Sequence, residues 1–346
     1  MLSSPALVVG LLVVATAAVV ANAEPAESVP ETSSEAAPRT GLWRDSADYW
    51  HDRLYFWVQR ELQQLDGALA PEVVDAPPTS ATTEAIEPRS PFRLELDLSA
   101  GDLASAQALS SSVRFDIDLQ LPRLERRLRV FLTTDDVSET LSDVADELRG
   151  GVRLRAFADA DVELGIKLDT PPVAYAAVRW GREHRRGPWW IHPFAKVFID
   201  SADGPGVSSA LVIDRWQDEV LWRSSSSILG LPRDSRTLWN QSWVIARTND
   251  ILFEGRPLTR VGSRDIVRGW GVEFSVAGEG GRTLERELAL FYKRPLQSDW
   301  LFVSFRPFWR SVRPVGVESG WEQEMGIRVG LDLLFWAPAG QRMNAP

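Results

Sequence analysis

The chain has 346 residues, a formal net charge of −10 at pH 7 and no cysteine. Its acidic balance does not fit a nucleic-acid-binding protein, which carries a basic face, and without cysteine it can form no disulfides. The length suits one large β domain or two small ones.

Residues 5–20 form an apolar run of mainly Ala, Val and Leu, and Ala21-Asn22-Ala23 has the small-x-small form of a signal-peptidase site. We therefore expect residues 1–23 to be a signal peptide, although no Lys or Arg precedes the run. An uncleaved membrane anchor is the alternative, but the run is short for a spanning helix of about 20 residues. No later stretch is as long and apolar, so a mature chain that enters a membrane must do so as a closed barrel.

Three segments precede the strand region. Residues 24–45 are rich in Glu, Pro, Ser, Thr and Ala and should be disordered after export, because they offer little apolar surface to bury. Residues 46–67 carry apolar side chains at spacings of three, four and seven, which predicts an amphipathic periplasmic helix. Its many aromatic residues favour packing against a barrel rim or plugging the barrel mouth, and a periplasmic partner or lipid headgroups are the alternatives. Residues 68–91 form a proline-rich linker.

From residue 92 onward the sequence alternates between apolar and polar residues. In residues 92–99 and 113–121 the polar face carries full charges, which suits a barrel with a polar lumen or an antiparallel sheet with one face in water. We predict an all-β fold, an antiparallel transmembrane β-barrel over residues 92–336 with a short N-terminal α-helix and a tail at 337–346. The patterns at 127–133 and 173–182 are weak, so we expect about 12 strands, with 14 as the alternative.

The joints between strands differ in length. Residues 159–161 and 217–219 look like tight turns, whereas longer pieces such as 311–323 look like loops. We expect the short joints at one end of the barrel and the long loops at the other. Residues 135–148 carry a helical apolar stripe among acidic residues, which predicts a short helix within a loop. Its acidic face is expected to be solvated, and a lumen constriction or a divalent-cation site is the alternative.

Tryptophan is frequent, with 15 residues, many of them near predicted strand ends. Membrane barrels place such rings at the two headgroup levels, where the apolar ring body and the polar N–H are both satisfied. A soluble β-sandwich core or a sugar-binding groove also uses tryptophan and is the alternative. The candidate girdle residues are Trp189, Trp216, Trp239, Trp300, Trp309 and Trp336.

The late strands also predict a polar inner surface. If their apolar positions face lipid, the alternate positions face a lumen. Side chains of both signs there could form a pore eyelet or could cross-link a closed interior. The candidate lumen residues are Glu273, Glu287, Lys293, Arg306, Arg328 and Asp332.

The last strand-like run, residues 324–336, alternates without a break between an apolar face and a polar or glycine face. Within it Arg328, Gly330, Leu333 and Phe335 follow a polar-x-Gly-x-x-apolar-x-apolar spacing. At the end of a secreted, strand-rich chain, this spacing resembles the C-terminal assembly signal of bacterial outer-membrane β-barrel proteins. The resemblance implies a place in the outer membrane of a Gram-negative bacterium, with the N-terminal segment in the periplasm. It also implies contact with outer-membrane lipid and lipopolysaccharide, and insertion by the barrel-assembly machinery.

The sequence nominates no catalytic, cofactor or metal site. Outer-membrane phospholipases bring nucleophile and base together in a short His-x-Ser-Asn segment, whereas His51, His184 and His192 have other neighbours here. We therefore expect a small passive pore, or a structural or assembly component of the outer membrane. The alternatives are an outer-membrane enzyme acting on lipid or lipopolysaccharide, and a secreted soluble β protein that binds carbohydrate. In the soluble protein, the apolar faces would pack against a second sheet.

Overall fold

The structure is a computed structural model that describes residues 42–69, 92–101, 109–120, 128–134, 148–157, 159–168, 171–202, 204–251, 262–263, 266–296, 300–313 and 320–335. The expected signal peptide, most of the disordered segment and of the linker, the helix at 135–148 apart from its last residue, Trp336 and the C-terminal tail lie outside these residues.

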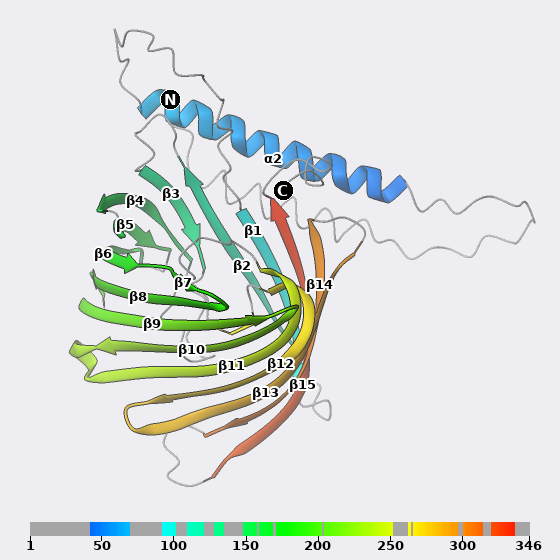
Figure 1. Ribbon diagram of the computed structural model, residues 1–346. Coiled ribbons are helices and arrows are strands. Elements are labelled where there is room, and N and C mark those ends of the chain that lie inside the picture. Colours follow the sequence, from blue (N-terminus) through cyan, green and yellow to red (C-terminus); the bar gives the residue numbers. More distant parts are fainter. Residues whose placement is uncertain are drawn as a thin grey trace, which may run out of the picture. The chain divides into compact units, whose positions relative to one another are not determined.

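The described chain consists of one long α-helix followed by strands (Figure 1), with one turn of 3-10 helix, η1 (Pro232–Asp234), between the tenth and eleventh strands. Helix α2 spans Leu42–Leu69, four residues longer at its start and two at its end than the sequence predicts, and among the described residues no helix is long and apolar enough to cross a bilayer. The strands are β1 (Phe92–Gly101), β2 (Leu109–Gln120), β3 (Leu128–Thr133), β4 (Arg149–Phe157), β5 (Ala160–Lys167), β6 (Val173–Gly181), β7 (His184–Arg186), β8 (Trp189–Asp200), β9 (Gly204–Gln217), β10 (Val220–Leu231), β11 (Arg236–Ile251), β12 (Ile266–Glu279), β13 (Arg282–Pro295), β14 (Leu301–Val312) and β15 (Glu322–Phe335).

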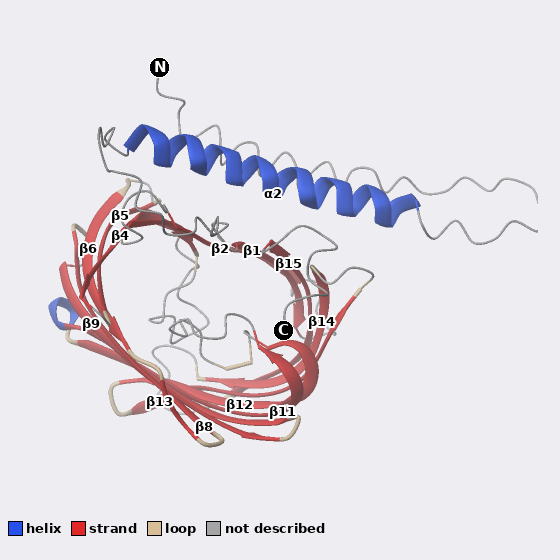
Figure 2. Ribbon diagram, turned by 45° about the horizontal axis from the view of Figure 1, so that its top comes forward, coloured by secondary structure: helices blue, strands red, loops and turns tan. Residues whose placement is uncertain are grey.

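The strands close into a ring (Figure 2). Neighbours in chain order pair antiparallel, and β1 pairs with β15 from Phe92 opposite Phe335 to Gly101 opposite Gly326. Strand β6 pairs with residues 194–200 of β8, and β7 pairs with residues 189–191 along the same edge of β8, so β7 continues β6 and adds no further place in the ring. Among the described residues, fourteen strands therefore form one closed sheet with no free edge.

The alternative count of fourteen strands is confirmed, and the count of about twelve is wrong. The two stretches with weak patterns, β3 and β6, both belong to the ring. In β6 the outward positions Ala174 and Ala176 carry only small side chains, which hides the alternation in the sequence. Backbone hydrogen bonds do not depend on side-chain size, so the strand still pairs on both sides.

Long connections occur at both ends of the ring. We call the end where β1 begins and β15 ends the terminal end. At the terminal end, two-residue turns link β4 to β5 and β9 to β10. At this same end, however, the long connection 252–265 links β11 to β12. The expectation of short joints at one end and long loops at the other is therefore wrong. The longest connection at the terminal end, 252–265, includes residues that contact the inside of the ring.

The outer face of the ring is apolar and exposed. On β13, Leu288, Leu290 and Tyr292 are exposed, whereas Glu287 and Lys293 on the alternate positions are buried. Other exposed apolar side chains with this outward placement are Leu164, Ile166, Val178, Val197, Ile199, Val207, Leu211, Ile228, Ile245, Val272, Phe274, Phe305, Val329 and Leu331.

This arrangement is the reverse of that in a soluble β protein, which buries its apolar face in a core. The described strands form one sheet, so no second sheet made of them covers the outer face. An apolar exterior around a closed ring with charged inner positions is the arrangement of a transmembrane β-barrel.

A small polar group interrupts the outer face on β10 and β11. The Ser226 hydroxyl donates to the Gln241 side-chain oxygen, and Gln241 Nε2 donates to Ser224 Oγ at 3.1 Å. Burying an amide or hydroxyl in apolar surroundings is costly unless it is hydrogen-bonded. The mutual bonds therefore make this group compatible with a lipid-facing surface.

Helix α2 docks on the terminal end of β15 through aromatic contacts. The His51 ring stacks on Phe335 and Trp300, with ring centroids 4.8 and 4.6 Å away. His51 Nε2 lies 3.2 Å from the Leu334 carbonyl oxygen, to which it can donate, and Trp300 Nε1 donates to Asp48 at 2.7 Å. These contacts fix one face of the helix against the barrel wall.

The docked face of α2 also has an apolar part. Tyr55 is buried against Phe335, and Leu54, Val58 and Leu333 pack around them. Leu333 and Phe335 lie on the outer face of β15, so the helix covers the outside of the wall at its terminal end.

A charge on the outer face should be costly if that face contacts lipid. Leu290 is 55% exposed, so in water Leu290→Arg would change the free energy of unfolding by no more than about 0.5 kcal/mol. In a bilayer we expect a loss of about 2–4 kcal/mol, measured by denaturant titration in phospholipid vesicles. Leu290→Phe, which keeps the surface apolar, is the control and should be tolerated. A loss no larger than that of the control would contradict a lipid-facing surface.

Candidate functional site

The six candidate lumen residues lie on the inner face of the ring. Glu273 is on β12, Glu287 and Lys293 are on β13, Arg306 is on β14, and Arg328 and Asp332 are on β15. All are buried or half-buried although all are charged. Their positions follow from the period of two along each strand, since each alternates with an outward apolar residue.

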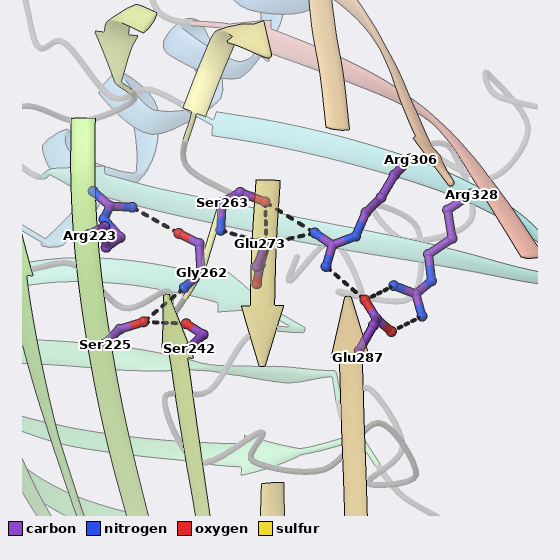
Figure 3. A network of polar contacts seen from close by, with 9 residues as sticks. All are labelled: Arg223, Ser225, Ser242, Gly262, Ser263, Glu273, Glu287, Arg306 and Arg328. Atoms are coloured by element: carbon purple, nitrogen blue, oxygen red, sulfur yellow. Dashed lines mark hydrogen bonds and ion pairs between the residues drawn. The ribbon is translucent and has the colours of Figure 1, made fainter. Parts of the chain in front are cut away.

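Four of these residues form a continuous charged network (Figure 3). Arg306 donates to Glu273 Oε2 at 2.9 Å and to Glu287 Oε1 at 2.8 Å. Arg328 donates to both oxygens of Glu287, at 2.8 and 2.7 Å. Glu287 is thus held between two guanidinium groups. The network has two negative carboxylates and two positive guanidinium groups, so its net charge is zero. Buried charges need partners of opposite sign in this way.

The other two candidates form a pair of their own. Lys293 Nζ lies 3.6 Å from Asp332 Oδ2, and both side chains are less than one-tenth exposed. The pair joins β13 to β15 across β14, on the inner side of the wall.

The network continues into the connection between β11 and β12. The Ser263 backbone N–H donates to Glu273 Oε2 at 3.2 Å, and the Ser263 hydroxyl donates to the same oxygen. Arg306 Nη1 also donates to Ser263 Oγ at 3.1 Å. Ser263 is therefore held on the inner face between β12 and β14.

Gly262, the residue before Ser263, is held by two side chains of β10. Its N–H donates to Ser225 Oγ at 3.2 Å, and its carbonyl accepts from Arg223 Nη1 at 3.0 Å (Figure 3). The φ angle of Gly262 is +89°, and a Cβ there would lie 2.4 Å from Glu273 Oε1. The positive φ favours glycine, and a Cβ would also displace the Glu273 carboxylate from its present position. Residues 262–263 thus fasten the connection to the inside of the ring.

Arg223 is anchored in turn by a fully buried ion pair. Its Nε and Nη2 each lie 2.7 Å from an oxygen of Asp214, and neither side chain is more than 1% exposed. The two-point contact gives the guanidinium a fixed direction. Arg223 can therefore present its remaining nitrogen to the Gly262 carbonyl.

A second charged cluster lies on the inner face of β4, β5 and β6. Glu163 on β5 accepts from Arg153 at 2.7 Å and from Arg179 at 2.6 Å. The two guanidinium groups also lie over the rings of Phe131 and Phe194, 4.9 and 5.0 Å from the centroids. Paired charges therefore occur on both halves of the ring interior.

The tryptophan candidates separate into different environments. Trp189 and Trp309 are exposed on the outer face, and Trp239 donates its indole N–H to the Gly280 carbonyl at 3.1 Å in a turn. Two assignments to a lipid-facing girdle are wrong. Trp216 lies two residues after Asp214, so it faces inward and packs against the buried cluster that includes Leu221. Trp300 is covered by α2, as described above.

The four residues that resemble an assembly signal divide between the two faces of β15. Arg328 and Gly330 face inward, and Leu333 and Phe335 face outward. A Cβ at Gly330 would lie 2.4 Å from Asp97 Oδ1 and 2.4 Å from Ser304 Oγ, so side chains from β1 and β14 converge over this position. A side chain at position 330 would therefore displace the Asp97 and Ser304 side chains. Recognition by assembly machinery stays a prediction.

Sequence reasoning missed Asp214, Arg223, Gly262 and Ser263. A signal for the first two exists, because a two-residue turn at 218–219 pairs Gln217 with Val220 and, by counting back, Asp214 with Arg223. Opposite charges directly across an antiparallel pair then predict a contact. Gly262-Ser263 has no comparable signal, since it lies in a connection without strand periodicity.

No protein-family model matches the chain, and no curated protein matches it in sequence. Among solved structures, Pseudomonas putida OprB is 9% identical with a TM-score of 0.39, over 71% of this chain and 94% of that one. The outer membrane channel DcaP of Acinetobacter baumannii is 8% identical with a TM-score of 0.38, over 71% and 96%. An anion-selective porin from Comamonas acidovorans is 8% identical with a TM-score of 0.36, over 71% and 98%. A likeness this loose carries no inference about the function of this chain.

Breaking the buried pair should be costly. Asp214→Leu leaves Arg223 buried without its carboxylate, and we expect a loss of about 3–5 kcal/mol in the free energy of unfolding. Adding Arg223→Leu removes the uncompensated charge and should recover much of that loss. Glu219→Leu, which breaks an exposed pair with Arg247, is the control and should cost at most about 1 kcal/mol. Equal effects of the Asp214 and Glu219 changes would contradict the burial of the pair.

Proposed function

We propose that the protein is a passive pore in the outer membrane of a Gram-negative bacterium. The observation that carries the proposal is the distribution of side chains on the ring, which has exposed apolar side chains on its outer face and ion pairs on its inner face. Charged residues inside a barrel need either partners or water. Outside, the apolar surface needs lipid.

The number of strands in the ring and the solvent exposure of its inner side chains support a channel. Rings of eight strands are filled by side chains, whereas porins of 16 to 18 strands hold an aqueous path. Fourteen strands lie between these sizes and suit a narrow opening. The side chains of Arg306 and Arg328 on the inner face are 19% and 28% exposed, which favours water inside the ring.

The fastened connection supports a constriction. Residues 262–263 reach the inner faces of β10, β12 and β14 through Arg223, Ser225, Glu273 and Arg306. Chain inside the ring reduces the cross-section left for solute. We infer that residues 262–263 narrow the pore.

The arrangement of the ends supports an orientation. Both ends of the ring's chain, at the start of β1 and the end of β15, lie at the terminal end together with α2. An exported barrel with an even strand number keeps both of these ends on one side. We place that side in the periplasm, with β15 as the strand recognised by the assembly machinery and lipopolysaccharide around the opposite end.

The pore proposal is tested by conductance in planar bilayers. The purified wild-type protein should give discrete, voltage-independent current steps. Gly262→Ala should release the connection, because a Cβ there meets Glu273 and the φ angle disfavours alanine. Because the constriction is then removed, we expect the single-channel conductance of this variant to be about twofold or more above that of the wild type.

Gly280→Ala is the matched control. Gly280 also has a positive φ, +56°, but a Cβ there meets nothing within 4 Å because the residue lies in an exposed turn. Its conductance should equal that of the wild type. Absence of steps from folded, inserted wild-type protein would overturn the pore. Wild-type conductance in Gly262→Ala would overturn the constriction.

A further inference from the structure

Helix α2 has a second face that does not dock on the barrel. The docked side carries Asp48, His51 and Tyr55. At helical spacing, the opposite side carries Tyr49, Trp50, Arg53, Phe56 and Arg60. Tyr49, Trp50 and Phe56 are 56%, 62% and 53% exposed, although large aromatic side chains are ordinarily buried.

The exposed aromatic residues are grouped with arginine. The Arg53 guanidinium lies 5.4 Å from the Trp50 ring centroid and 5.9 Å from that of Tyr49, and it donates to the Tyr49 hydroxyl at 2.9 Å. Rings with a polar edge beside guanidinium groups suit a headgroup layer, which is apolar on one side and wet on the other.

Among the helix side chains that the structure describes, the charges on this face are positive. In residues 47–60 the two carboxylates belong to Asp48, which accepts from Trp300, and Asp52, which lies 3.0 Å from His51 Nδ1. Both are engaged by residues of the docked face. Arg53 and Arg60 on the other face are exposed. An anionic surface therefore complements this face better than a neutral one does.

The position of the helix connects this face to the lipid-facing wall. Its docking residues cover Leu333 and Phe335, which continue the exposed series Val329 and Leu331 along the outer face of β15. The helix therefore lies at the level of the barrel wall where the exposed apolar surface of β15 ends. In a membrane barrel that level is occupied by phospholipid headgroups.

We propose that α2 is a membrane-surface anchor whose face of Tyr49, Trp50, Arg53, Phe56 and Arg60 binds anionic phospholipid headgroups at the terminal end of the barrel. The proposal rests on the proposed insertion of the ring in a membrane. The aromatic rings enter the headgroup region, and the two guanidinium groups pair with lipid phosphates.

Site-directed spin labelling of the full chain tests this directly, since the protein has no cysteine of its own. Three single-cysteine variants are labelled and reconstituted in vesicles of phosphatidylethanolamine and phosphatidylglycerol. Phe56→Cys reports on the helix, Phe305→Cys on the outer wall, and Glu219→Cys on an exposed turn at the terminal end. Accessibility to oxygen marks lipid, and accessibility to a water-soluble nickel chelate marks solvent.

We expect the oxygen-to-nickel ratio of the Phe56 label to lie between those of the Phe305 and Glu219 labels, and clearly above that of the Glu219 label, as for a side chain at the headgroup level. In a background of Arg53→Gln and Arg60→Gln, that ratio should fall toward the Glu219 value.

Two results would count against the proposals in different ways. A Phe56 label as accessible to nickel as the Glu219 label, with the Phe305 label still in lipid, would overturn the anchor and leave the membrane barrel standing. A Phe305 label in water would instead contradict the proposed function itself.

Discussion

The structure depends on the closure of the strand ring by backbone hydrogen bonds. In the hydrocarbon of a membrane no water can satisfy an unpaired N–H or C=O, so a sheet must have no edge. The pairing of β1 with β15 over ten residue positions, and of β6 directly with β8, meets that requirement among the described strands. Once the ring is closed, the period of two along each strand sends alternate side chains outward and inward. An apolar exterior and a charged interior then follow from one sequence pattern.

The interior meets a second requirement, because charges withdrawn from bulk water need partners. Glu287 is held by Arg306 and Arg328, Asp214 holds Arg223, and Glu163 binds two arginines. These contacts join strands that are not all adjacent, and so they brace the wall from inside. They also fix Gly262 and Ser263, which gives these two residues a defined place on the inner face. Arginine suits this task since its planar group serves two acceptors at once.

Much of this could be predicted from the sequence, and the failures have physical causes. The long alternation through β15 and the charged alternate positions predicted the closed barrel and the inward direction of residues such as Glu287 and Arg328. The strand count was underestimated because alanines in β6 weaken a pattern that backbone pairing does not need. Trp216 and Trp300 were misplaced because proximity to a strand end does not reveal which face a residue occupies or what covers it. The role of Gly262 depends on a positive φ and on a neighbour across the ring, neither of which adjacent residues encode.

The most direct measurement compares electrophoretic mobility with and without boiling, on protein extracted from membranes in mild detergent. A closed hydrogen-bonded barrel resists the detergent of the gel until it is heated, because its sheet has no edge from which to unravel. A membrane-inserted ring predicts a compact, fast-migrating form that shifts to the mobility of the unfolded chain after boiling. Recovery of the protein in the soluble periplasmic fraction, with the same mobility before and after boiling, would contradict it.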